Sequence, residues 1–368
     1  MLYRKFGKTG IEVSALGFGA MRFENADDIE ASAQTVYHAF ERGITYFDTA
    51  PGYFKGKSEE AVGLAVREMK KTDKDFFIST KSMKPGGAEL RRDLEESLAR
   101  LEVDAIDFYH CWYVLTPEDW EGRKSGGAVE EILKAKEEGL IRHTAFSTHL
   151  AGPDIRRVIE EGYFEGVTLG YSAINFPYRE EGLAAAGEHN LGVVVMNPLG
   201  GGTIVQNPDI FSFITRRPDQ SVLDGALHFL LGHEAITTAL VGFRNIHDVD
   251  EAVESIDRYE VYSPEDIEAL KARVTEEFDS LCTTCRYCDI CPEGIEVWKF
   301  AETANHAILG SDAKLSMRLK MHWGTDIDEL ERCSECRKCE EVCTQHLPIL
   351  ERFELVKRRV AEETRREE

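Results

Sequence analysis

The segment ITYFDTAPGYFKGKSEEAVGLAVREMK (residues 44–70) predicts a strand, a loop and a helix in succession. Its first part, ITYFDTA (44–50), is apolar almost throughout, which is typical of a strand buried on both faces of a parallel sheet. Its last part, SEEAVGLAVREMK (58–70), repeats apolar residues every three or four positions, as an amphipathic helix does. A strand followed by a helix is the repeating unit of parallel α/β folds.

The same unit recurs along the chain up to about residue 260. Apolar runs that predict strands occupy residues 14–21, 44–50, 76–81, 105–112, 141–147, 166–172, 192–199 and 237–243, and amphipathic helical patterns lie between them. Eight such units close a (β/α)8 TIM barrel, which is the α/β fold that we expect, and a doubly wound open sheet is the alternative. A last helix is predicted over residues 262–278, with Ser263 as its cap and Pro264 at its first position.

Composition limits the classes of partner. The 368 residues carry a formal net charge of −23, which argues against nucleic acid and anionic membranes as partners because both attract basic surfaces. No apolar run approaches the roughly 20 residues of a membrane helix, and the first residues lack the apolar core of a secretory signal. We therefore expect a soluble, cytoplasmic protein that acts on a small-molecule substrate.

Eight of the nine cysteines lie in two runs, CTTCRYCDIC (282–291) and CSECRKCEEVC (333–343). In a reducing cytoplasm such clusters indicate metal ligands or redox centres rather than disulfides. The second run has the C-x2-C-x2-C-x3-C spacing of [4Fe–4S] ferredoxins, in which three thiolates of one run bind one cluster and the other run supplies the fourth ligand. Zinc usually takes two separated C-x2-C pairs, and zinc, redox thiols or disulfides are the alternatives.

The ferredoxin rule groups the eight cysteines into two sets. One [4Fe–4S] cluster would be bound by Cys282, Cys285, Cys288 and Cys343, and the other by Cys333, Cys336, Cys339 and Cys291. The pattern departs from ferredoxins at two points. Two residues, not three, separate Cys288 from Cys291, and Thr344, not proline, follows Cys343. We expect a barrel at residues 1–278 and a small α-helical ferredoxin-like domain at residues 279–368, with helices at about 295–309 and 311–321 and a charged terminal helix.

Four polar residues lie at the ends of consecutive predicted strands, where the reactive residues of such barrels gather. They are Asp48, Tyr53, Lys81 and His110. This set suits carbonyl reduction, in which a phenol gives a proton to the carbonyl oxygen while a cofactor supplies a hydride to the carbon. The ordinary pKa of a phenol, near ~10, is too high for this transfer, and a neighbouring ammonium held by a carboxylate lowers it.

At this point the sequence resembles the aldo-keto reductase family. MLYRKFGKTGIEVSALGFGAMR (1–22) is similar to the opening hairpin and first strand of that family, and FDTAPGYFKGKSE (47–59) to its Asp-to-Tyr motif. AFSTH (145–149) and VMNPLGGG (195–202) are similar to motifs of its fifth and seventh strands. The resemblance covers roughly residues 1–260 and implies a barrel that binds NADH or NADPH and uses Asp48, Tyr53 and Lys81. With its cysteine runs, the whole chain resembles a subfamily that carries a C-terminal [4Fe–4S] domain.

The resemblance is incomplete at the fourth catalytic position and at the cofactor site, where Thr148 and Thr168 also replace the common Asn and Gln. The family has histidine where Trp112 stands, and His110 lies two residues earlier on the same face of the strand, where it is either a catalytic substitute or a core residue. Asp248 replaces an arginine that would face the 2′-phosphate of NADPH, which favours NADH unless Arg244 compensates. The resemblance assigns Ser147, Met196, Leu199, Gly200, Gly202, Gly242 and Arg244 to the cofactor.

Two functions follow from these patterns. The first is an NAD(P)H-dependent oxidoreductase acting on a carbonyl or hydroxyl compound, whose two [4Fe–4S] clusters exchange electrons with the barrel or with a redox partner protein. The second is an iron–sulfur electron-transfer protein whose barrel is no longer a carbonyl reductase. Trp112 favours the second function, and the retained Asp48, Tyr53 and Lys81 favour the first.

Overall fold

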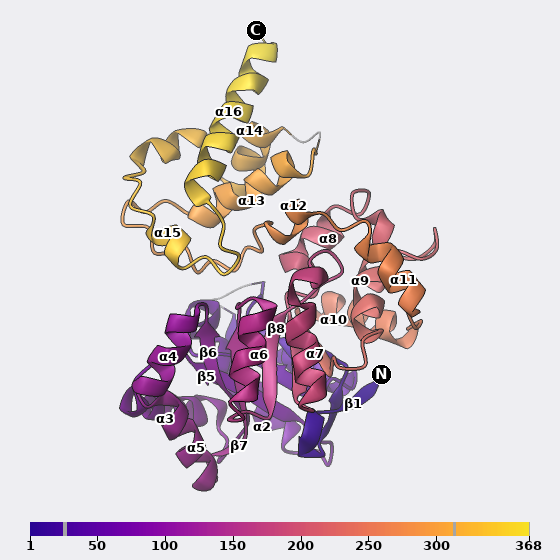
Figure 1. The fold of residues 1–368 in the computed structure, drawn as a ribbon, viewed down its shortest axis with the longest axis vertical. Coiled ribbons are helices and arrows are strands. Elements are labelled where there is room, and N and C mark those ends of the chain that lie inside the picture. The colour runs from indigo at the N-terminus through magenta and orange to yellow at the C-terminus, as the bar shows by residue number, and fades with distance from the viewer. Residues whose placement is uncertain (25–27, 312–313, 368) are drawn as a thin grey trace. The chain divides into compact units, whose positions relative to one another are not determined.

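Eight parallel strands close into a barrel in the computed structural model, which describes residues 1–24, 28–311 and 314–367 (Figure 1). The strands are β3 (Leu16–Gly19), β4 (Tyr46–Asp48), β5 (Phe77–Ser82), β6 (Ile106–Val114), β7 (Ile141–Thr148), β8 (Gly166–Gly170), β9 (Gly192–Met196) and β10 (Thr238–Gly242). Neighbouring strands follow chain order, and β10 pairs with both β9 and β3. The predicted TIM barrel is thus confirmed, and closure excludes the open sheet.

An antiparallel hairpin, β1 (Tyr3–Lys5) with β2 (Glu12–Ser14), precedes the barrel. Phe6, which follows β1, is fully buried and packs on the rings of Tyr46 and Phe108. A Cβ atom at Gly192 would lie 2.0 Å from the Phe6 ring, and one at Gly166 would lie 2.7 Å from it. Since these glycines begin β9 and β8, Phe6 fills the N-terminal end of the barrel. The opposite end, where the strands finish, is the end that carries chemistry in such barrels.

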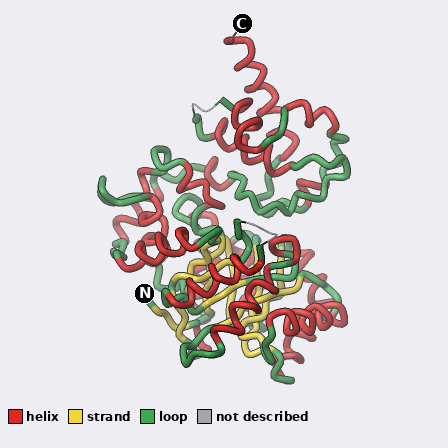
Figure 2. The backbone as a smooth tube through the Cα atoms, turned by 180° about the vertical axis from the view of Figure 1, so that it is seen from behind, coloured by secondary structure: helices red, strands yellow, loops and turns green. Residues whose placement is uncertain are grey.

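Helices surround these strands (Figure 2). The chain forms two compact units, and the first, Met1–Leu199 with Ile214–Ala272, contains the barrel. Its helices are α1 (Ile29–Glu41), α2 (Ser58–Met69), α3 (Gly87–Leu101), α4 (Pro117–Ser125), α5 (Ala128–Glu137), α6 (Gly152–Glu160), α7 (Glu180–Glu188), α9 (Val222–Leu231), α10 (Ile246–Asp257) and α11 (Pro264–Lys271). The predicted helix over 262–278 begins as expected, with a capping box at Ser263, but ends at Lys271. The β-branched pair Val274 and Thr275, which disfavours helix, lies in the break that follows.

A second compact unit consists of Gly200–Phe213 and Arg273–Glu368. Its helices are α8 (Thr203–Gln206), α12 (Glu276–Asp279), α13 (Val297–Ile308), α14 (Leu315–Met317), α15 (Lys338–Glu341) and α16 (Ile349–Glu367). The helix expected at about 295–309 corresponds to α13. In place of the helix expected at 311–321, the short helix α14 is followed directly by a π-helical segment over Arg318–Trp323. Residues 312–313 of the expected helix lie outside the described ranges.

The two units divide the chain differently from the expected ranges 1–278 and 279–368. The segment Gly200–Phe213 follows β9 in sequence but packs with the cysteine-containing part. Its aromatic side chains explain this, because the rings of Phe211 and Phe213 lie 5.6 and 5.7 Å from that of Phe278. Among the described residues, no helix is both long and apolar enough to cross a membrane.

Candidate functional site

Asp48 and Lys81 form a buried ion pair at the ends of β4 and β5. Lys81 Nζ lies 2.6 Å from Asp48 Oδ1, and each side chain is only 3% exposed. Neighbouring parallel strands bring them together, since Asp48 is in register with Ser79, two residues before Lys81. The Ser79 hydroxyl donates to the second carboxylate oxygen over 2.8 Å, so both Asp48 oxygens are engaged and the ammonium is held in place.

Tyr53 and Trp112 flank the ammonium of this pair. Lys81 Nζ lies 4.9 Å from the centroid of the Tyr53 ring and 5.8 Å from that of Trp112, and the two rings meet edge to face at 5.5 Å. The turn after Tyr53 is strained, because Phe54 and Lys55 both adopt positive φ angles of 53° and 57°. The Lys81 ammonium therefore lies against both aromatic rings.

His110 lies deeper, in the barrel interior. It is fully buried, with Nδ1 3.3 Å from Ser79 Oγ and Nε2 2.9 Å from Thr168 Oγ1. Because Ser79 gives its proton to Asp48, we infer that His110 Nδ1–H donates to Ser79 and that Thr168 donates to Nε2. Burial, with the nearby charge of Lys81, lowers the pKa of His110 to about 3, so the imidazole is neutral.

The residues expected to hold the cofactor lie at several strand ends. Ser147 is buried near the end of β7, while Met196 and Gly242 are the last residues of β9 and β10. Leu199 ends a segment of the first unit, whereas Gly200 and Gly202 belong to the second. The structure therefore does not place all seven in one compact unit.

Arg244, also expected at the cofactor, is bound to Asp248. Its guanidinium donates to both carboxylate oxygens over 2.8 and 3.0 Å, while its side chain is 66% exposed. Burial alone would raise the pKa of Asp248, but the hydrogen bonds and charge of Arg244 lower it overall. The two residues from which a cofactor preference was expected are thus paired with each other.

Gly201 brings the segment after β9 against the first cysteine run. Its φ is +69°, and a Cβ atom there would lie 2.2 Å from the carbonyl oxygen of Thr283. Only glycine allows this backbone approach without displacement. The glycine segment is therefore fixed to the loop that carries Cys282 and Cys285.

The eight clustered cysteines line two cavities within the second unit. The first cavity, about 310 Å³ including the part open to solvent, is lined by Cys282, Cys285, Cys288 and Cys343. The second, about 330 Å³ by the same measure, is lined by Cys291, Cys333, Cys336 and Cys339. Each cavity thus combines three cysteines of one run with the last cysteine of the other, the grouping that the ferredoxin rule gives.

The two cysteine runs share an unusual backbone conformation. Thr284 and Glu335, each two residues after the first cysteine of a run, have φ angles of 51° and 55°. Arg286 and Arg337, each directly after the second cysteine, have φ angles of 65° and 59°. Left-handed conformations cost non-glycine residues roughly 1–2 kcal/mol each, and their repetition at equivalent positions shows that the two loops share one backbone geometry.

Backbone amides face the sulfur atoms. Thr284 N donates to Cys282 Sγ and Leu347 N to Cys343 Sγ, both over 3.4 Å. Burial raises the pKa of Cys282 to about 12 and that of Cys339 to about 11, so their thiolates need a nearby cation. Among the described residues, no three His, Cys, Asp or Glu side chains are arranged to hold a single metal ion.

A model of the aldo/keto reductase family matches residues 15–274 of the 368-residue chain. The chain belongs to the aldo/keto reductase family. It is similar to the uncharacterized oxidoreductase YqkF of Bacillus subtilis (strain 168), with 24% identity over 313 residues, 75% of this chain and 98% of that protein. It is also similar to L-galactose dehydrogenase of Arabidopsis thaliana, with 27% identity over 293 residues, 70% of this chain and 88% of that protein.

Solved aldo/keto reductases share the barrel fold. AKR11C1 from Bacillus halodurans (holo form) superposes with a TM-score of 0.65 at 23% identity, covering 75% of this chain and 97% of that one. The Klebsiella pneumoniae enzyme in complex with NADP and acetate gives 0.62 at 22% identity, covering 74% and 96%. This aldo/keto reductase is accordingly an oxidoreductase, and the family match ends before its first clustered cysteine.

Several residues of this aldo/keto reductase site escaped the sequence reasoning. Ser79 could have been found, since it lies two residues before Lys81 and so shares a strand face with it. The role of Thr168 as a partner of His110 requires the closed barrel, because β6 and β8 are not neighbours.

Proposed function

We propose that this aldo/keto reductase reduces a carbonyl compound with NADH or NADPH and carries two [4Fe–4S] clusters, one in each four-cysteine cavity. The observation that carries the first part is the buried Asp48–Lys81 pair facing Tyr53 and Trp112. The observation that supports the second is the grouping of the eight cysteines around two cavities of similar size.

In the proposed reaction the reduced nicotinamide supplies the hydride to the carbonyl carbon. Tyr53 gives its phenolic proton to the carbonyl oxygen, and the Lys81 ammonium stabilises the phenolate that remains until solvent returns a proton. Asp48 and Ser79 keep Lys81 in position. Neutral His110 orients Ser79 from behind, so its part in catalysis is positioning rather than proton donation.

The proposed cofactor would bind along those expected residues that belong to the first unit, which are Ser147, Met196, Leu199, Gly242 and Arg244. The NADP complex of the Klebsiella pneumoniae enzyme supports a nicotinamide dinucleotide in this fold. Because Asp248 already neutralises Arg244, a 2′-phosphate would gain less attraction there than beside an unpaired arginine, and we therefore propose a preference for NADH. Fluorescence titration with each cofactor measures the preference. Clearly tighter NADPH binding would contradict this preference.

The proposed clusters fit the residues present. A cubane with cysteine ligands needs four thiols around one cavity, and each cavity provides them. The loops also have left-handed residues at equivalent positions, and backbone amides donate to sulfur. When bound, such a cluster exchanges single electrons, and a redox partner protein would supply or accept them. Cys336, the exposed cysteine of the second cavity, marks where such a partner would approach.

A second candidate function is electron transfer alone. It is favoured by His110, whose two ring nitrogens are already engaged, and by Trp112, which stands in the place of the family histidine. An anaerobic assay distinguishes the two candidate functions. It measures oxidation of NADH and NADPH with either 4-nitrobenzaldehyde or the one-electron acceptor ferricyanide as the oxidant. We expect aldehyde reduction, lowered about 10²–10⁴-fold in Tyr53→Phe with unchanged cofactor binding. Ferricyanide reduction without aldehyde reduction would support the second candidate instead.

A further inference from the structure

Arg352, on α16, is a buried cation in the second unit. It is 4% exposed, and it donates to Asn305 Oδ1 over 3.2 Å and to the carbonyl oxygen of Ser280. Its Nε has no hydrogen-bond partner among the described atoms, and no carboxylate in the described ranges acts on its charge. Burial lowers the pKa of Arg352, and the nearby Cys282 and Cys343 act in the opposite direction.

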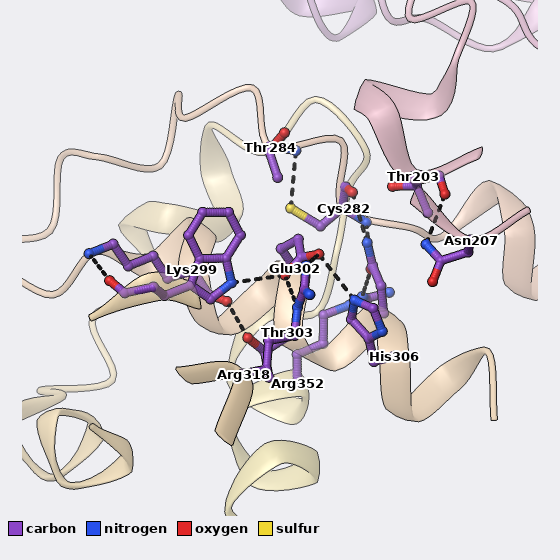
Figure 3. A network of polar contacts seen from close by, with 12 residues as sticks. Thr203, Asn207, Cys282, Thr284, Lys299, Glu302, Thr303, His306, Arg318 and Arg352 are labelled. Atoms are coloured by element: carbon purple, nitrogen blue, oxygen red, sulfur yellow. Dashed lines mark hydrogen bonds and ion pairs between the residues drawn. The ribbon is translucent and has the colours of Figure 1, made fainter. Parts of the chain in front are cut away.

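A buried charge with only neutral partners is unfavourable by several kcal/mol, so a negative group is expected beside Arg352. Cys282 and Cys343 come from different runs, and both line the first cavity. The amide of Asn305 binds the backbone of Cys282 in both directions over 2.9 Å and also accepts from Arg352. Figure 3 shows Arg352 and Cys282 in this one network of polar contacts.

The second cavity lacks an equivalent among its lining residues as far as the structure describes them. Its cations, Arg337 and Lys338, are exposed to solvent, which screens their charge. Arg337 is also paired with Glu340 over 2.8 Å. Glu340, which directly follows Cys339 in the chain, adds a negative charge to the same loop.

We propose that Arg352 is the counter-charge of the cluster in the first cavity and raises its reduction potential. The inference rests on the proposed function. A cluster with four thiolate ligands is anionic, and its reduction adds one electron and no proton, so a buried positive charge favours the reduced form. Solvent cannot screen Arg352 as it screens the exposed Arg286, which also lines the first cavity.

The test is an anaerobic redox titration of the intact protein with dithionite, followed by electron paramagnetic resonance and accompanied by iron analysis. Arg352→Met is expected to lower one of the two midpoint potentials and leave the other unchanged. Arg352→Lys keeps the charge and restores most of the wild-type value. The matched control Arg286→Gln, at the same cavity but exposed, produces a smaller shift.

If Arg352→Met loses about half of the iron while Arg352→Lys keeps all of it, a counter-charge is also supported. Equal loss of iron in Arg352→Met and Arg352→Lys would show that Arg352 acts through packing and not through its charge, and would overturn the inference. A shift in Arg352→Met no larger than in Arg286→Gln would do the same. Wild-type protein without iron would contradict the proposed clusters, a failure that is visible before any variant is made.

Discussion

The Lys81→Met substitution removes the ammonium from a pair in which both side chains are only 3% exposed. It leaves the Asp48 carboxylate buried with Ser79 as its remaining donor. Breaking a buried pair in this way costs roughly 3–5 kcal/mol, so unfolding monitored in urea should show a loss of that size. Turnover of an aldehyde should fall about 10²–10⁴-fold, because the phenolate of Tyr53 is no longer stabilised.

The double variant Asp48→Asn/Lys81→Met separates stability from chemistry. It removes both charges, and the amide still accepts from Ser79, so most of the lost stability should return while turnover stays low. The control Lys71→Met breaks an exposed pair with Glu68 at 2.7 Å and should cost less than about 1 kcal/mol. Recovery of turnover in the double variant, or a loss under about 1 kcal/mol in Lys81→Met, would refute the reasoning.

Two further predictions concern stability. His110 is charged in the unfolded chain below pH 6.5 but neutral in the folded protein down to about pH 3, so it lowers stability as pH falls below 6.5. Urea unfolding of His110→Asn should show about 1.2 kcal/mol less loss of stability between pH 7 and pH 5.5 than the wild type, and an equal loss would contradict this prediction. Gly201→Ala and Gly310→Ala impose similar strain at φ +69° and +66°, but only Gly201 faces the Thr283 backbone. Gly201→Ala should therefore cost about 1–3 kcal/mol more, and equal losses would disprove the contact.

The barrel could be predicted from sequence because each strand is an uninterrupted buried run, and eight such runs admit few arrangements. The meeting of Asp48 with Lys81 also followed from sequence, since both end neighbouring parallel strands. The sequence did not indicate which residue of β6 lies beside Tyr53. His110 and Trp112 share a strand face, and the register shift between Cys111 and Val114, with Tyr113 at φ 67°, has no sequence signal.

The second unit was less accessible to sequence reasoning. Cysteine spacing suggested which four side chains would gather, but it carried no information on the charges around them. Arg352 lies nine residues beyond Cys343 on a helix with many other charges, and only tertiary packing distinguishes it. The association of Gly200–Phe213 with this unit likewise depends on aromatic contacts between segments far apart in the chain.

The central claim, an aldo/keto reductase with two clusters, is tested most directly by iron and acid-labile sulfide analysis of anaerobically purified protein. We predict about eight iron and eight sulfide per chain, since two cubanes contain four of each. Cys288→Ser, at the first cavity, should lose about half of both, and Cys111→Ser, in β6 and not among the residues that line either cavity, should lose none. Colourless protein with stoichiometric zinc, or iron that persists in Cys288→Ser, would contradict the account.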